Sequence, residues 1–130
     1  METMEKISIS HVSNAHGDWL RALNFYKDEI GILRNRLTEI ASKNTGREVM
    51  RDVEHFENQF KLQKDNIQVL SHDIKQNVKS IKRQVEDPHA GYIDGDLAEQ
   101  HNSFNDKFSG EEKVINELRH EFNDFAAQWM

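Results

Sequence analysis

The sequence contains no cysteine, one proline and only six glycines among its 130 residues. The lack of cysteine excludes disulfide scaffolds, thiolate metal sites and thiol nucleophiles, so any chemistry would have to rest on other side chains. No stretch approaches the roughly 20 apolar residues of a membrane span, and the opening METMEKISIS holds no apolar run typical of a secretory signal. We therefore expect a cytoplasmic protein.

Charged residues make up 31% of the chain and apolar residues 36%, a balance typical of a folded domain rather than a disordered or membrane-spanning chain. The formal net charge is −6, and the whole acidic excess lies in residues 88–130. A net-acidic protein repels phosphate groups, so we expect neither a nucleic acid nor a membrane as partner. One basic cluster stands out and consists of Lys75, Lys79, Lys82 and Arg83. We expect Asp94, Asp96 and Glu99 to neutralise this cluster.

Apolar side chains recur at alternating steps of four and three residues along three segments, which is the spacing of one helix face. The first segment carries Val12, His16, Trp19, Leu23, Tyr26, Ile30, Leu33, Leu37 and Ile40. The second carries Val49, Val53, Phe56, Phe60, Gln63, Ile67, Leu70, Ile74, Val78, Ile81 and Val85. The third carries Leu97, His101, Phe104, Phe108, Glu111, Ile115, Leu118, Phe122, Phe125 and Trp129.

Turn residues separate the three segments. Gly46 follows the first helix, and Thr45 with Glu48 has the spacing of a capping box that begins the second. Pro88 ends the second helix, because the residue before a proline avoids the helical region. We predict a linker over residues 87–95 and helices over about residues 11–43, 46–86 and 96–129.

The short connections favour antiparallel neighbours, so we predict an all-α fold, an elongated up-down-up three-helix bundle with left-handed coiled-coil-like packing and one domain over residues 1–130. Ser109 and Gly110 interrupt the third segment, but the apolar stripe crosses them in register, so we expect a kink rather than a break. In the second segment a strict seven-residue repeat would put Asn77 in the core. The apolar residues there are instead spaced by eleven residues, so we expect Val78 rather than Asn77 to lie in the core.

Aligning the three stripes by level places two pairs of polar residues inside the bundle. Tyr26 shares a level with Glu111, and we expect the phenol to donate a hydrogen bond to the carboxylate in a buried polar layer that fixes the register. His16 shares a level with His101 on the parallel first and third helices.

A divalent-metal site at the linker end is the first chemical hypothesis. His11 and His89 lie in the adjoining segments, so four of the seven histidines are expected to gather there. Zinc and similar ions need three or four ligands, whereas periodicity places only His16 and His101. Two histidines at the edge of the core are the alternative, and we expect no other cofactor.

His72 and Lys75 form a His-x-x-Lys pair on the outer side of the second helix. The pair resembles the exposed histidine motif of histidine phosphotransfer domains, which are helical bundles of similar size. The resemblance implies that His72 would accept a phosphoryl group. That family's motif continues with a glycine after the lysine, where this chain has Gln76.

Four apolar side chains repeat at outer helix positions. Antiparallel pairing puts Phe25 level with Val69 and Ile32 level with Leu62. If the third helix packs on the far side of the helix pair, the four form an exposed apolar patch, which is typical of a partner surface. If it packs on the near side, they widen the core.

No nucleophile elbow or glycine-rich phosphate loop occurs in the sequence, so we do not expect an enzyme. We predict a protein-interaction or assembly module, with a protein partner or a second copy in a homodimer. The architecture resembles that of spectrin-type repeats, which are also up-down-up three-helix rods with a tryptophan in the first helix, where this chain has Trp19. The resemblance concerns the fold pattern alone and implies no function.

Overall fold

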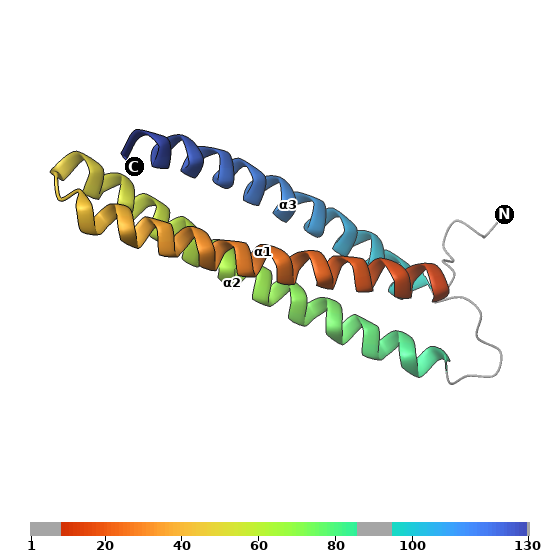
Figure 1. The fold of residues 1–130 in the computed structure, drawn as a ribbon. Helices are drawn as coiled ribbons and strands as arrows, with labels where there is room; N and C mark the ends of the chain where they lie inside the picture. The colour runs from red at the N-terminus through yellow and green to blue at the C-terminus, as the bar shows by residue number, and fades with distance from the viewer. Residues whose placement is uncertain (1–8, 86–94, 130) are drawn as a thin grey trace.

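The computed structural model describes residues 9–85 and 95–129, which form three α-helices and the tight turn between the first two (Figure 1). Helix α1 spans Ile9–Lys43, α2 spans Arg47–Val85 and α3 spans Gly95–Trp129. The helices run up, down and up along one long axis, and each packs against the other two. The all-α three-helix bundle predicted from the sequence is confirmed.

The turn between α1 and α2 is held by Asn44 rather than by the predicted capping box. Gly46 stands at the cap of α2, where its carbonyl accepts a hydrogen bond from the Met50 amide at 3.0 Å. Thr45 therefore precedes the cap and cannot form the box with Glu48. The Asn44 side chain donates to the carbonyl of Ile40 at 2.9 Å and to that of Trp129 at 3.3 Å, which joins the turn to the end of α3.

Helix α3 runs without a break through Ser109 and Gly110. A methyl group added at Gly110 would meet no atom within 4 Å, and the same holds at Gly31 in α1. Both glycines therefore face open space in this structure. Flanking apolar residues hold the helix in place, because Phe104 and Ile115 on either side of the expected kink are buried.

The apolar stripes meet along the bundle axis and form one continuous core. At the end that holds the α1–α2 turn the core is aromatic, with ring centroids 5.0 to 6.1 Å apart between Phe56, Phe60, Phe122 and Phe125. Each buried large side chain contributes about 1.5 to 3 kcal/mol, and aromatic pairs add about 0.5 to 1.5 kcal/mol. Val85 and Leu97 were expected to form the last layer, and their side chains are outside what the structure describes.

The predicted eleven-residue step in α2 is wrong, because the helix keeps its seven-residue phase. Asn77 is 3% exposed, whereas Val78 is only half-buried. Ile74 and Ile81, seven residues apart, are both buried and fix the face on which Asn77 lies. The Asn77 amide donates to Oε1 of Gln100 on α3 at 2.7 Å, so the core accepts a polar side chain at the heptad position.

In the part of the chain that the structure describes, no helix is both long and apolar enough to cross a membrane.

Candidate functional site

Three histidines and a tryptophan gather near the beginning of α1. The ring centroids of His16 and His101 lie 5.5 Å apart, which is the shared level that the stripe alignment predicts. Trp19 stacks on His101 at 5.0 Å, and the His11 ring lies edge-on to His101 at 6.0 Å. His16 is 2% exposed and His101 is 6% exposed, so two titratable side chains occupy core positions at this end of the bundle.

Burial keeps these two imidazoles neutral. Desolvation, with a smaller contribution from His101, lowers the pKa of His16 to about 4. Desolvation also lowers the pKa of His101, and His11 adds to that effect. Both ring nitrogens of His16 and Nδ1 of His101 are buried without a hydrogen-bond partner among the described residues. Such unpaired buried nitrogens cost folding free energy, so the two histidines make this end of the core less stable than apolar side chains would.

The structure brings together three of the four histidines predicted as metal ligands. Each of His11 and His16 contacts His101, but no three His, Asp or Glu side chains of residues 9–85 and 95–129 are arranged to hold a metal ion. His89 lies outside the described residues. The metal site therefore stays a prediction.

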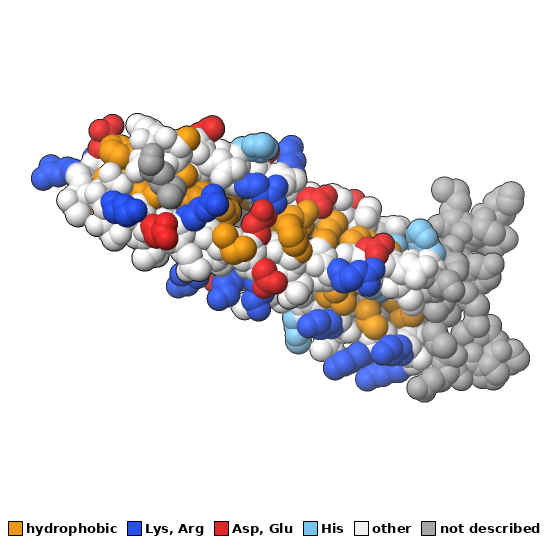
Figure 2. Space-filling model, in the orientation of Figure 1, with side chains coloured by type: hydrophobic (Ala, Val, Ile, Leu, Met, Phe, Trp, Pro, Cys, Tyr) orange, Lys and Arg blue, Asp and Glu red, His pale blue; other side chains and the backbone are white. Residues whose placement is uncertain are grey.

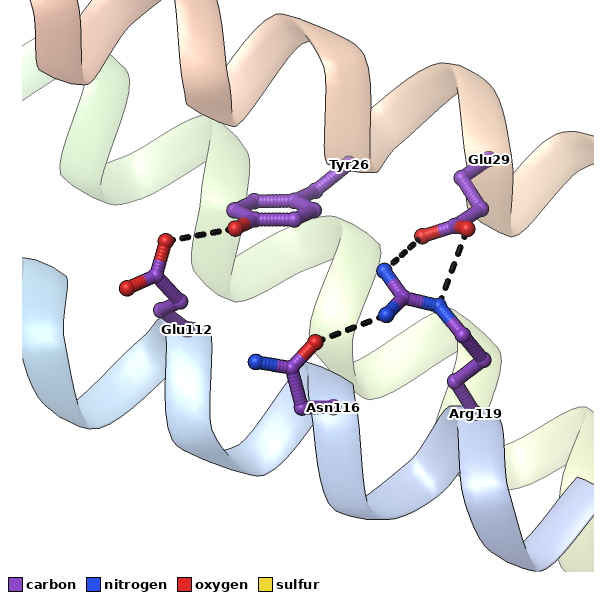
Figure 3. Close-up of polar contacts among 5 residues, drawn as sticks. All are labelled: Tyr26, Glu29, Glu112, Asn116 and Arg119. Atoms are coloured by element: carbon purple, nitrogen blue, oxygen red, sulfur yellow. Dashed lines mark hydrogen bonds and ion pairs between the residues drawn. The ribbon is translucent and has the colours of Figure 1, made fainter.

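A polar network joins α1 to α3 near the middle of the bundle (Figure 3). Arg119 of α3 extends its guanidinium to both carboxylate oxygens of Glu29, with Nε to Oε2 at 2.9 Å, and donates to Oδ1 of Asn116 at 2.8 Å. Glu29 raises the pKa of Arg119 by accepting these hydrogen bonds. Because the ion pair is bidentate and partly buried, it fixes the register of α1 against α3.

The predicted pair of Tyr26 with Glu111 is corrected to Tyr26 with Glu112. The phenol donates to Oε2 of Glu112 at 2.5 Å (Figure 3). A tyrosine ring is long enough to carry its hydroxyl past the core position to the flank of the bundle, where Glu112 lies. Burial, and then the Glu112 carboxylate, raises the pKa of Tyr26 to about 12.

Glu111 itself is half-buried, and its Oε2 has no partner among the described residues. Burial raises the pKa of its carboxyl group.

His72 lies exposed beside a groove of about 460 Å³ between α1 and α2. The groove has a basic and polar lining that includes Arg21, Lys27, Gln68, Ser71 and Lys75. An exposed imidazole is what phosphotransfer requires. The phosphotransfer hypothesis stays untested.

The four predicted patch residues are all exposed, Phe25 at 60%, Ile32 at 59%, Leu62 at 48% and Val69 at 61%. They do not line one groove. Val69 borders a groove between α2 and α3, whereas Ile32 borders a depression shared by α1 and Lys64 of α2. The single patch across α1 and α2 is therefore replaced by separate surfaces.

The groove between α2 and α3 has a volume of about 500 Å³. Its lining is more apolar than that of the groove between α1 and α2. Val69 of α2 and Val114 of α3 form part of its rim, and Leu70 lies beneath them. Gly110 leaves its α3 wall without a side chain, and Glu111 places its half-buried carboxylate there. Leu62 lies two helical turns from Val69 and so shares its face of α2.

Sequence reasoning missed Val114 and the ion pair between Glu29 and Arg119. Val114 is 40% exposed and stands one residue before the buried Ile115, so it was not part of the third stripe. Glu29 follows Tyr26 by three residues, and Arg119 follows Glu112 by seven. This spacing puts each pair on one helix flank, so the sequence could have placed the two pairs on facing flanks of α1 and α3.

No protein-family model matches the sequence, and neither a curated protein nor a solved structure matches it.

Proposed function

We propose that this chain is a non-enzymatic protein-interaction module that binds its partner on the surface of α2 and α3. The observation that carries the proposal is the apolar rim of the α2–α3 groove, where Val69 and Val114 lie exposed on a chain with a mean hydropathy of −0.84. The exposed Leu62 lies two helical turns before Val69 on the same face of α2. Exposed apolar side chains that gather on one surface are typical of binding sites.

The rest of the bundle supports this role. The core is continuous over nearly the whole described length, so the surface is carried on rigid helices rather than on loops. A rigid surface loses little conformational entropy on binding, which favours affinity. Gly110 adds to this by allowing a partner to approach the α3 backbone closely.

A photo-crosslinking amino acid placed at position 69 tests the proposal in the cell that produces the protein. We expect one discrete crosslinked product, because a specific partner covers Val69. The matched control places the same amino acid at Asn35, an exposed polar residue of α1, and should give no discrete product. Equal and diffuse labelling from both positions would contradict the proposal.

Divalent-metal binding at the histidine end is a second candidate function. It is favoured by the three buried ring nitrogens of His16 and His101 that have no partner among the described residues. Titration with zinc should then raise the melting temperature of the protein and leave that of the His101→Leu variant unchanged. An unchanged melting temperature of the wild-type protein would exclude this candidate.

A further inference from the structure

The groove between α1 and α2 gathers positive charge on a protein whose net charge is negative. Arg21 and Lys27 line this basic groove from α1, and Lys75 lines it from α2. All three side chains are exposed to solvent. Among the described residues that line the basic groove there is no aspartate or glutamate. An anion that enters the groove therefore meets cations on both of its walls.

The positive charge continues along α2 beyond the basic groove. Residues 74–83 contain no acidic residue and four basic ones, Lys75, Lys79, Lys82 and Arg83. Lysine and arginine side chains gather over this part of α2 in Figure 2. Within the described residues no ion pair joins these side chains to a carboxylate, so the neutralisation by Glu99 expected from the sequence is not seen. Charges more than about 10 Å away are largely screened at 0.1 M salt, so the local cations outweigh the net charge of −6.

Neutral hydrogen-bonding groups line the basic groove between the cations. Asn24 of α1 and Gln68 and Ser71 of α2 all belong to its lining. Amide and hydroxyl groups donate hydrogen bonds, as ammonium and guanidinium groups do. A phosphate group offers three acceptor oxygens and up to two negative charges, whereas a carboxylate offers two oxygens and one charge. So many donors in one groove therefore favour phosphate over carboxylate as the ligand group.

The dimensions of the basic groove favour a small molecule with more than one phosphate group. Its volume of about 460 Å³ lies in the range of small-molecule sites, which is about 300 to 1,000 Å³. Arg21 and Lys27 are six residues apart on α1, which corresponds to about 9 Å along the helix axis. A single phosphate ion cannot contact both side chains at once, but a chain of phosphate groups can.

Arg21 already has an anionic partner, because its guanidinium pairs with the carboxylate of Asp18 one turn earlier on α1. Both side chains are more than 70% exposed, and exposed ion pairs contribute little free energy. The guanidinium can therefore exchange this carboxylate for a phosphate group, which it binds through two parallel hydrogen bonds.

We propose that the basic groove binds a small molecule that carries a chain of two or more phosphate groups, such as inorganic polyphosphate or a nucleoside triphosphate. Arg21 and Lys27 hold the phosphate chain from α1, and Lys75 holds it from α2. The proposal goes beyond the interaction function, because the basic groove lies between α1 and α2 and the apolar rim of Val69 and Val114 lies between α2 and α3.

Isothermal titration calorimetry of the full chain with sodium tripolyphosphate tests the proposal. At 0.05 M sodium chloride we expect one site per chain, with a dissociation constant that rises at least about tenfold at 0.5 M. Orthophosphate should bind more weakly than tripolyphosphate. The Lys27→Gln/Lys75→Gln variant should raise the dissociation constant for tripolyphosphate at least about tenfold, because it removes one cation from each wall of the groove.

Two control variants remove the same charge elsewhere. Lys43→Gln/Lys113→Gln changes exposed lysines of α1 and α3 away from the groove, and should bind tripolyphosphate like the wild-type protein. Lys79→Gln/Lys82→Gln changes lysines of α2 that do not line the groove, and should have a smaller effect than the groove variant. Circular dichroism verifies that each variant is helical. Equal losses of affinity in all three variants would overturn the proposal, because overall charge rather than the groove would then attract the anion.

Two further ligands separate the sources of the anionic group. If ATP binds more tightly than tripolyphosphate, the ligand is a nucleotide whose nucleoside adds contacts, and equal affinities identify the phosphate chain alone as the ligand group. Hexaglutamate that binds as tightly as tripolyphosphate would overturn the proposal in favour of an acidic peptide. The absence of binding by both phosphate compounds would overturn it as well, and would leave the interaction function of the α2–α3 surface unaffected.

Discussion

At the scale of single residues, the main feature is that buried polar groups take core positions without full hydrogen bonding. His16, His101 and Asn77 are nearly inaccessible, yet each has a side-chain atom without a partner among the described residues. Buried polar groups of this kind lower stability and favour one helix register over others.

Acidification should destabilise the protein through His16. Its folded-state pKa of about 4 lies below the ordinary histidine value of 6.5, so the unfolded chain binds a proton first as the pH falls. The stability is fully present above pH 6.5 and is lost as the pH falls toward 4, at up to about 1.4 kcal/mol per pH unit. Urea denaturation across this range measures the slope.

The His16→Leu variant should show a shallower pH dependence of its unfolding free energy than the wild-type protein. The exposed His120 provides the control, because His120→Gln should leave the slope unchanged. Equal slopes for all three proteins would mean that His16 is not buried in neutral form.

Replacement of Asn77 should raise stability. Asn77→Leu puts an apolar side chain at a buried heptad position and leaves Gln100, which is exposed and can bond to water. We expect a gain of about 1 to 2 kcal/mol in the free energy of unfolding, measured by urea denaturation. A loss of stability would show that the bond to Gln100 outweighs apolar burial.

At the scale of elements, the sequence predicts the helices well because periodicity and turn residues are local signals. The two helix ends at the α1–α2 turn, Lys43 and Arg47, lie within one residue of the predicted ones. The errors lie where tertiary packing decides. Asn77 stays in the core because Ile74 and Ile81 fix the phase of α2, and Tyr26 bonds to Glu112 because its hydroxyl extends past the core level.

The candidate surfaces were less predictable for the same reason. Sequence placed Leu62 and Val69 correctly on the outside of α2, but could not tell on which side α3 packs. The structure puts α3 beside Val69, so the relevant neighbour is Val114 rather than Phe25 or Ile32.

Glycines inside the helices should be replaceable with a gain in stability. Gly31→Ala adds a methyl group in open space within α1, and alanine exceeds glycine in helix propensity by about 1 kcal/mol. Gly17→Ala is the comparison, because its added carbon would lie 3.4 Å from Nη1 of Arg21 and so restrict that side chain. Thermal denaturation should rank Gly31→Ala above Gly17→Ala, and the reverse order would contradict the described packing.

At the scale of the whole molecule, the bundle is a rod whose α1–α2 groove has a basic and polar lining and whose α2–α3 groove has an apolar rim. Net charge alone hides the basic cluster of α2, because carboxylates elsewhere outnumber it.

Val69→Glu should weaken binding of the partner, whereas Ile32→Glu should not. The two side chains are almost equally exposed, at 61% and 59%, but only Val69 borders the α2–α3 groove. The yield of the discrete product from a photo-crosslinking amino acid at position 114 measures the difference between the two variants. Equal losses of yield would show that the place of the apolar side chain on the surface does not matter.

The interaction surface is tested most directly by crosslinking from position 114, on the α3 side of the groove. We expect a photo-crosslinking amino acid at position 114 to give the same discrete product as at position 69, because Val69 and Val114 both border the α2–α3 groove. No product from position 114, or a product that contains a different protein from that at position 69, would contradict the proposed surface.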